Sequence, residues 1–320
     1  MPCCSVNVVE KNCGVQSFGR RGNSALSLAW LKMNTQLLKS IINFAKNDEN
    51  IRAIILEGSI AAQFQTDALS DYDLNLFCIN YDSYLSNADW LDQFGKVLLY
   101  QKEQFQFYTD IIPTRLVLFH GLLRIDFSFW HINLLTDIVQ GRKQYESYNN
   151  GYKIIIDKDK LAKQLAPSNG EGYIIPKPNR STFLQFIYDF WFETYCIAKY
   201  LYRNDLWYAK KMENSILKEK LFLMILWNYQ AKNNWKQNTL IHKDGKRFEK
   251  WIPSEYHDLV TSCFSRYDKD DTWRSLLLTF ESFNKIAKET AVFIHVEYPL
   301  QKEKEINEYI NSIKRINKTC

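Results

Sequence analysis

The stretch EGSIAAQFQTDALSDYDLNLF, residues 57–77, connects two apolar segments through a polar loop. The first segment, IRAIILEG at residues 51–58, ends at a glycine and predicts a short buried strand. The second, DLNLFCI at residues 73–79, alternates in polarity and predicts another strand. Two aspartates, Asp71 and Asp73, mark the start of this second strand. A pair of buried strands with carboxylates at their junction indicates an α/β scaffold that carries a functional site.

The two aspartates are one residue apart, so both side chains leave the strand on the same face. Like charges on one face repel, and each carboxylate costs free energy to desolvate. A divalent cation removes both costs, and Mg²⁺ prefers oxygen ligands. Asp126 is a single acid in the apolar run LLRIDFSFW, residues 122–130. If its strand lies beside that of Asp71 and Asp73, the three carboxylates can bind two metal ions that bridge the reacting phosphates.

Gly58 and Ser59 follow the first strand and complete this pattern. A glycine lets the backbone approach an anion closely, and a turn exposes its N–H groups. The serine hydroxyl adds a hydrogen-bond donor without adding charge. The pair is therefore predicted to bind phosphate groups. Each motif by itself is also typical of ordinary surface turns, and only the combination is specific.

Composition narrows the class of protein. The chain has 320 residues, is 46% hydrophobic and carries a net charge of +5 from 41 basic and 36 acidic residues. The basic residues are spread along the chain, which argues against a nucleic-acid partner. Seven cysteines without regular spacing indicate neither a disulfide framework nor a zinc site, so a reducing, cytoplasmic location is expected. No apolar run approaches the roughly 20 residues that span a bilayer, so no membrane association is expected.

The pattern changes along the chain and predicts an α+β protein of two domains. Residues 1–24 show no periodicity, and residues 1–32 are interpreted as a disordered leader or an extension before a start at Met33. Residues 33–165 alternate helical and strand patterns, whereas residues 181–320 repeat apolar positions at helical spacing. The stretch rich in proline, glycine and asparagine at about 166–180 is the expected linker.

These motifs resemble the signature of the DNA-polymerase-β-type nucleotidyltransferase superfamily. Within it, the chain is similar to the streptomycin (aminoglycoside) 6-adenylyltransferases from about Met33 to the C-terminus. The resemblance rests on IRAIILEGS, SDYDLNLF, WLDQFG, LRIDFSFW, YDFWFETYCIAKYLYR, LWYAKKMENSILKEKLFLMILW and WRSLLLTFESFNKIAKETA. It implies an N-terminal nucleotidyltransferase domain, in which helices flank a mixed sheet, and a C-terminal helical bundle that binds the substrate.

The resemblance also implies an activity. ATP would donate AMP to a hydroxyl of streptomycin, inactivating the antibiotic, and pyrophosphate would leave. Asp71, Asp73 and Asp126 would hold Mg²⁺, with two ions expected, and Asp126 would also count among the catalytic residues. Gly58 and Ser59 would bind the triphosphate. The implied partners are ATP and a cationic antibiotic, for a monomer or a homodimer.

Three residues of the first C-terminal helix carry further implied roles. Asp189 stands where the family has an acid in its EFW motif and is the candidate general base, and Glu193, one turn further on, is the second choice. Lys199 matches a lysine that contacts the nucleotide phosphates. An exposed helix acid and a solvated helix lysine are the ordinary alternatives for these positions. Carboxylates and aromatic rings would bind the guanidinium groups of the acceptor, with Trp191, Tyr195 and Trp207 as candidates or core residues.

One position departs from the family. Relatives usually carry arginine after Gly-Ser, and here the residue is Ile60. This puts the donor affinity and the acceptor in question, although the three aspartates are kept. Two alternatives therefore stay open: the same chemistry on another acceptor (another aminoglycoside, a lincosamide or a protein hydroxyl), or a non-catalytic nucleotide-binding module of the same fold.

Overall fold

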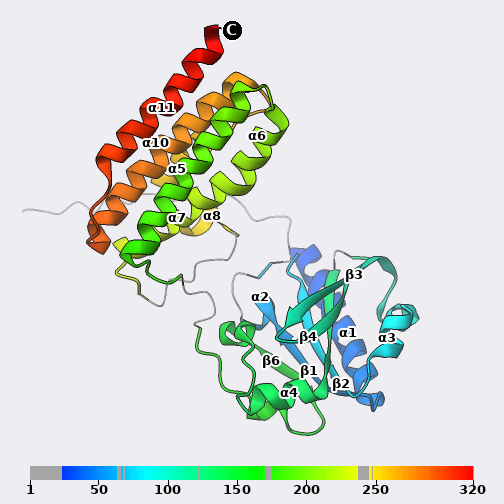
Figure 1. Ribbon diagram of the computed structural model, residues 1–320. Coiled ribbons are helices and arrows are strands. Elements are labelled where there is room, and N and C mark those ends of the chain that lie inside the picture. Colours follow the sequence, from blue (N-terminus) through cyan, green and yellow to red (C-terminus); the bar gives the residue numbers. More distant parts are fainter. Residues whose placement is uncertain are drawn as a thin grey trace, which may run out of the picture. The chain divides into compact units, whose positions relative to one another are not determined.

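The computed structural model describes residues 24–62, 66–67, 69–121, 123–170, 175–236, 245–246 and 248–319. The chain divides into two compact units after residue 169. This division falls within the stretch that the sequence indicates as a linker. The first unit contains a sheet, and the second is helical (Figure 1).

The first unit is built on a six-stranded mixed sheet with the order β3-β4-β5-β2-β1-β6. Strands β2 and β5 pair in parallel, and the other neighbours pair antiparallel. The strands predicted around the two aspartates and around Asp126 are thus immediate neighbours. The bounds of the strands are β1 Ile51–Glu57, β2 Tyr72–Cys78, β3 Val97–Phe107, β4 Asp110–Phe119, β5 Leu123–His131 and β6 Lys153–Asp157.

Helices cover both faces of the sheet (Figure 1). Helix α1, Ser24–Asn47, places Leu37 and Ile41 in a core with residues of β2 and β5. On the opposite face, helix α4, Ile132–Val139, places Leu134 against a second core. Shorter helical segments join the strands: α2 Gly58–Ala61, α3 Asp82–Ser86, η1 Asp89–Phe94, η2 Glu146–Asn150 and η3 Ala162–Gln164.

One detail of the first unit differs from the prediction. Helix α1 begins at Ser24, so residues 24–32 are helical and not disordered. The run of alanine, leucine and lysine there has high helix propensity and contains no breaker. Residues 1–23 lie outside the described residues. Between β2 and Gly95 the chain forms two helical segments, α3 and η1, because Asn87 has an extended backbone and accepts a hydrogen bond from the N–H of Asp89.

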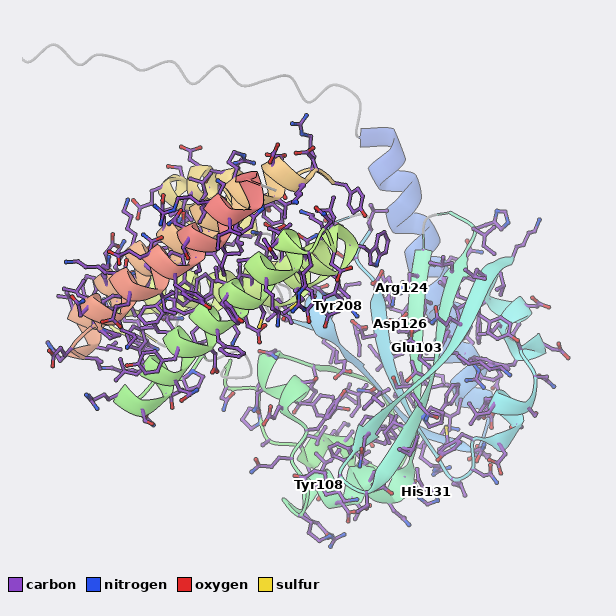
Figure 2. The ribbon with its side chains drawn as sticks, turned by 45° about the horizontal axis from the view of Figure 1, so that its top comes forward. Glu103, Tyr108, Arg124, Asp126, His131 and Tyr208 are labelled. Atoms are coloured by element: carbon purple, nitrogen blue, oxygen red, sulfur yellow. The ribbon has the colours of Figure 1, made fainter. Side chains whose placement is uncertain are left out.

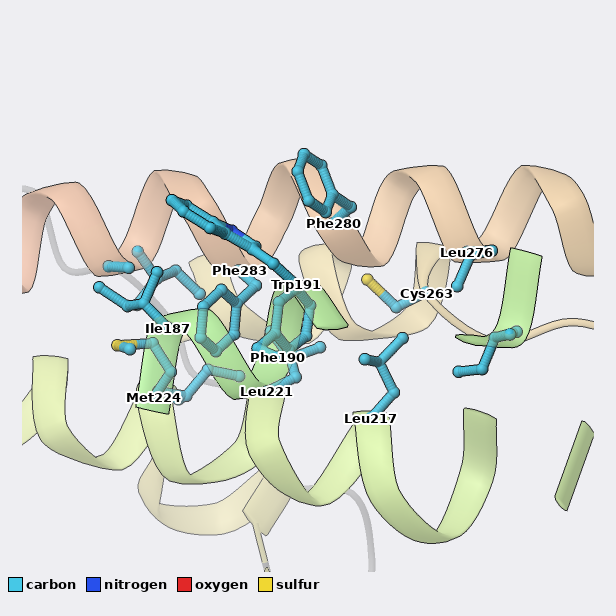
Figure 3. Close-up of a cluster of buried hydrophobic side chains, with 14 of the residues drawn as sticks. Ile187, Phe190, Trp191, Leu217, Leu221, Met224, Cys263, Leu276, Phe280 and Phe283 are labelled. Carbon is cyan, nitrogen blue, oxygen red and sulfur yellow. The ribbon is translucent and has the colours of Figure 1, made fainter. Parts of the chain in front are cut away.

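The second unit is a bundle around helices α5, α7 and α10. Phe190 of α5 stacks on Phe283 of α10, with ring centroids 3.6 Å apart, at the centre of its core (Figure 3). The elements are α5 Arg180–Tyr202, α6 Leu206–Met212, the π-helical turn η4 Glu213–Leu217, α7 Lys218–Lys232, α8 Phe248–Trp251, α9 Ser254–Ser262, α10 Lys269–Ile294 and α11 Leu300–Thr319. The predicted α+β fold, a mixed sheet with helices followed by a helical bundle, is confirmed.

The ends of these helices follow from local chemistry. Asn179 caps α5, because its side chain accepts a hydrogen bond from the N–H of Thr182 at 2.9 Å. Helix α10 ends at His295 in the left-handed conformation. Pro299 then separates α10 from α11, because proline cannot continue a helix.

Candidate active site

Three carboxylates form a row across the middle of the sheet. In the antiparallel pairing of β1 and β2, Glu57 is opposite Asp73, and in the parallel pairing of β2 and β5, Asp73 is opposite Asp126. Paired residues of neighbouring strands share one face of a sheet. The row of Glu57, Asp73 and Asp126, here called the carboxylate row, therefore lies on the face that α4 partly covers. Two residues further along β2, Asn75 pairs with Ser128, and beyond them the face becomes apolar.

Arg124 holds two of the acids. Its Nε and Nη2 donate to the two carboxylate oxygens of Asp126 at 2.9 and 2.8 Å. Its Nη1 also lies 3.4 Å from Oδ2 of Asp71. Figure 2 shows Arg124 and Asp126 at one end of the sheet and His131 at the other. The guanidinium thus balances the charge of the acids at the start of β2 and β5.

The charged form of Asp73 is disfavoured by its surroundings, because the carboxyl group is buried beside other acids. Burial, followed by the neighbouring charges of Asp126, Glu57 and Asp71, raises the pKa of its carboxyl to about 7. Arg124 opposes this rise only in part. The negative charge on the row is therefore incompletely balanced by the protein, and an added cation at Asp73 is electrostatically favoured.

Gly58 lies directly against this carboxylate. Its φ is +73°, and a Cβ built there would overlap Oδ2 of Asp73. Only glycine accepts both the left-handed backbone and this approach without strain. Ser59 follows with an exposed side chain, and Ile60 packs against the core beneath α1. Ile60, at the position where the family resemblance leads us to expect arginine, thus contributes to the core in this chain.

Glu57 belongs to this site, although sequence reasoning did not select it. The hydroxyl of Tyr145 donates to its Oε1 at 2.9 Å, and its Oε2 is buried without a hydrogen bond of ordinary geometry. The Asn75 amide lies near enough to favour the charged form, yet burial still raises the pKa of Glu57 to about 7. The sequence does show an acid at the end of an apolar strand, which is a weak sign of a functional residue. Only the register of β1 and β2, which places Glu57 opposite Asp73, assigns it to this site.

The predicted metal ligands have the right chemistry for Mg²⁺. In the described part of the chain, no three His, Cys, Asp or Glu side chains are arranged to hold a metal ion as they stand. Mg²⁺, however, usually takes one or two carboxylates and completes its shell with water and substrate phosphates. Asp73 and Asp126 are adjacent oxygen donors from two strands, and the raised pKa of Asp73 reflects burial and then repulsion, both of which a bound cation offsets. These residues therefore fit the ion.

The remaining predicted residues lie on helix α5 of the second unit. Asp189 is half-buried, and its Oδ1 accepts a hydrogen bond from Nε2 of Gln185 at 2.8 Å. Glu193 is also half-buried, one turn further along the helix. The ammonium of Lys199 lies 5.6 Å and 5.1 Å from the ring centroids of Tyr195 and Tyr200. Lys199 therefore has aromatic neighbours and is not simply a solvated lysine.

The aromatic candidates divide into core and surface. Trp191 is 2% exposed and its Nε1 donates to Oδ1 of Asn284 at 2.8 Å, so it is a core residue. Tyr195 is half-buried and faces Tyr309, with ring centroids 5.8 Å apart. Trp207, at the start of α6, is 76% exposed and is the large ring of this set that can stack on a ligand.

Within the described residues, no helix combines the length and apolar character needed to cross a membrane. The cysteines in this part of the chain, Cys78, Cys196 and Cys263, all carry free thiols.

Comparisons with known proteins point to one family of enzymes. A sequence model of the streptomycin adenylyltransferase family matches residues 31–313. Aminoglycoside 6-adenylyltransferases of Campylobacter jejuni and Staphylococcus aureus are each 26% identical, over 89% and 88% of this chain and 97% and 99% of their own. The enzyme of the same name from Bacillus subtilis is 24% identical over 84% of this chain and 94% of its own. A crystal structure of an aminoglycoside 6-adenyltransferase from Bacillus subtilis covers 87% of this chain and 97% of its own, with 22% identity and a TM-score of 0.43.

The mixed sheet, the Gly-Ser turn against an aspartate and the pairing of Asp73 with Asp126 fit a nucleotidyltransferase, and the protein is an enzyme of that class. More specifically, the chain belongs to the streptomycin adenylyltransferase family.

Proposed function

We propose that this enzyme transfers AMP from ATP to a hydroxyl of streptomycin, with Mg²⁺ bound at the carboxylate row. The pairing of Asp73 with Asp126 beside Gly58 is the observation that carries the proposal. Relatives that match nearly their whole length are named for adenylyl transfer to aminoglycosides at the 6 position, which supports the donor and the class of acceptor. The proposed use of ATP as the donor and the free thiols of Cys78, Cys196 and Cys263 also support a cytoplasmic location.

The residues of the first unit would bind and orient the donor. Asp73 and Asp126, with Asp71, would hold Mg²⁺. Bound Mg²⁺ supplies positive charge that offsets the charge of the triphosphate. Gly58 brings backbone close to the row, and the exposed Ser59 hydroxyl is available to donate to a phosphate oxygen.

The transfer itself exchanges one phosphorus–oxygen bond for another. The acceptor hydroxyl oxygen forms a bond to the α-phosphorus of ATP, and the bond from that phosphorus to the bridging oxygen of pyrophosphate breaks. The hydroxyl proton passes to a general base, for which Asp189 is our first candidate and Glu193 the second. Lys199 is the candidate for contact with the nucleotide phosphates.

The helical unit offers a surface suited to a cationic acceptor. Asp189 and Glu193 lie one turn apart on the same side of α5, and the indole of Trp207 is exposed at the start of α6. Carboxylates pair with guanidinium groups, and aromatic faces attract cations. Streptomycin carries two guanidinium groups, and these features support it as the acceptor.

The test is to incubate the enzyme with Mg²⁺, streptomycin and each of the four nucleoside triphosphates, and to weigh the product by mass spectrometry. We expect an adduct of the mass of AMP with ATP only, and none when Mg²⁺ is chelated. A parallel set of acceptors, comprising other aminoglycosides, a lincosamide and a protein, tests the alternatives. Adducts on one of these but not on streptomycin would reassign the acceptor, and no adduct on any would overturn the proposal.

Two variants test the site itself. Asp73→Asn keeps the shape of the side chain and removes its charge, so we expect AMP transfer to fall by at least about a thousandfold, because Mg²⁺ and the triphosphate lose their anchor. Asp92→Asn makes the same change at an exposed acid of η1 in the same unit and should leave the rate unchanged. Full activity of Asp73→Asn would remove the carboxylate row from the mechanism.

A further inference from the structure

Glu57 is a fourth acid at a site for which sequence reasoning selected three. It is held in register with Asp73 by the antiparallel pairing of β1 and β2, so the two carboxyl groups lie on one face of the sheet. Their mutual repulsion contributes to the raised pKa of Asp73. The chain thus places a charge beside Asp73 where that charge destabilises the isolated protein.

The surroundings of Glu57 fix one of its oxygens, whereas the other has only the nearby Asn75 amide and no hydrogen bond of ordinary geometry. Tyr145, which precedes η2, donates its hydroxyl to Oε1 at 2.9 Å. The neighbouring amide of Asn75 donates from Nδ2 to the hydroxyl of Tyr148 at 3.2 Å and accepts from Nε1 of Trp130 at 2.9 Å. Oε2 is buried and makes no hydrogen bond of ordinary geometry. A buried carboxylate oxygen left in this way costs stability.

A purely structural role does not account for a carboxylate at this position. Glutamine has the same shape and would accept the hydrogen bond from Tyr145 through its amide oxygen. It would do so without burying a charge or repelling Asp73. The carboxylate is useful only if a cation reaches the row, because its charge and its Oε2 are then both compensated.

We propose that Glu57 is a functional carboxylate of this site, supplying Oε2 to the divalent cation that Asp73 binds. This inference rests on the proposed function, since it assumes that the row receives Mg²⁺. Glu57 would then help to hold the ion while Tyr145 keeps the carboxyl group in place. The position would be a cation ligand that lies on β1, whereas Asp73 and Asp126 lie on β2 and β5 and Asp71 directly precedes β2.

The test is the affinity of the full chain for Mn²⁺ alone, measured by electron paramagnetic resonance in the absence of nucleotide. Mn²⁺ accepts the same oxygen ligands as Mg²⁺. For Glu57→Gln we expect about tenfold weaker Mn²⁺ binding than for the unchanged protein. The melting temperature without metal should stay equal or rise, because the buried charge is removed. A structural role predicts the opposite pattern, a lower melting temperature with unchanged Mn²⁺ affinity, and that result would overturn the proposal.

Three further variants make the outcome decisive. Glu103→Gln changes an exposed acid on β3 of the same unit and should bind Mn²⁺ as the unchanged protein does. Tyr145→Phe releases Oε1 but keeps the charge, so it should weaken Mn²⁺ binding less than Glu57→Gln. If Glu57→Gln does not fold, Glu57→Asp withdraws the carboxylate by one methylene group, and wild-type Mn²⁺ affinity in that variant would refute the inference.

The Mn²⁺ measurement needs neither ATP nor streptomycin, so the two proposals can fail separately. A protein that binds Mn²⁺ through Glu57 but transfers no AMP would overturn the proposed function only. A protein that adenylylates streptomycin while Glu57→Gln binds Mn²⁺ normally would overturn this inference only. Absence of Mn²⁺ binding in the unchanged protein would count against the inference.

Discussion

Gly58 and Asp73 are in direct contact across two strands, and this contact shapes the candidate site. The glycine turns the chain at the end of β1 with a positive φ, and the absence of a side chain leaves room for the carboxylate. Asp73 is thereby held among Asp126, Glu57 and Asp71, which raise its pKa together with burial. At the scale of single residues, the site is a group of acids whose repulsion is only partly balanced by Arg124.

We predict that Gly58→Ala combines a modest loss of stability with a large loss of activity. The left-handed backbone costs an alanine about 1–2 kcal/mol of unfolding free energy, and its Cβ displaces the Asp73 carboxylate. A displacement of this kind reduces AMP transfer by about a hundredfold. Urea unfolding and the rate of adduct formation measure the two effects.

Gly141→Ala provides the matched control for this prediction. Gly141 has a φ of +70°, close to that of Gly58, but a Cβ there meets nothing within 4 Å. It should therefore show the loss of stability without the loss of AMP transfer. Equal activity losses in the two variants would mean that strain, and not contact with Asp73, explains the effect.

The elements of the helical unit show how a buried charge is accommodated. Glu213 is fully buried in the π-helical turn η4, between α6 and α7. Lys210 and Lys218 donate to its carboxylate at 2.8 and 3.2 Å, and Ser275 of α10 donates as well. Burial lowers the pKa of Lys218, while Glu213 raises it in opposition. This cluster links α6, η4, α7 and α10 through hydrogen bonds, in addition to the apolar core that they share.

We predict that Glu213→Ala is strongly destabilising. Removal of one partner leaves Lys210 and Lys218 with uncompensated charge in or near the core, at a cost of about 3–5 kcal/mol in unfolding free energy. Glu305→Ala, which breaks an exposed pair with Lys302 on α11, should leave stability nearly unchanged. Chemical denaturation of both variants compares them, and a similar small effect in each would contradict a structural role for the cluster.

At the scale of the whole molecule, the two units have separate cores. The core of the helical unit draws its buried residues from α5 to α11, and the two cores on either side of the sheet draw theirs from the first unit. The candidate cation site belongs to the first unit, whereas the candidate base and the exposed Trp207 belong to the second. Each unit can therefore be perturbed through its own core.

We predict that Phe283→Ala weakens the helical unit and spares the cation site. The ring is fully buried and stacks on Phe190, so its loss costs about 3–5 kcal/mol in that unit. Calorimetry should show one unfolding transition at a lower temperature and another in place, with unchanged Mn²⁺ affinity. Phe127→Ala, at a fully buried position of β5, should move the other transition. A single transition that shifts as a whole in both variants would disprove the separation.

Much of this architecture could be predicted because it is encoded locally. Strands β1, β2 and β5 correspond to short apolar runs, and the long helices of the second unit correspond to apolar positions at helical spacing. The start of α1 was missed because its first residues lack an amphipathic pattern, and helix propensity continues the helix without one. From the sequence, Asp73 and Asp126 were expected to meet only if their strands were neighbours. The sheet order places β2 beside β5 and so fulfils this condition.

The sequence by itself determined the acids, the glycine and the family, because these depend on residue types at fixed spacing along the chain. Only the tertiary structure decided which groups meet: Glu57 with Asp73, Arg124 with Asp71 and Asp126, and Tyr145 with Glu57. The sequence likewise allows Trp191 to be either a ligand-stacking residue or a core residue. Its burial and its hydrogen bond to Asn284 make it a core residue. Register between strands and packing between helices depend on contacts across long stretches of chain, which local patterns do not specify.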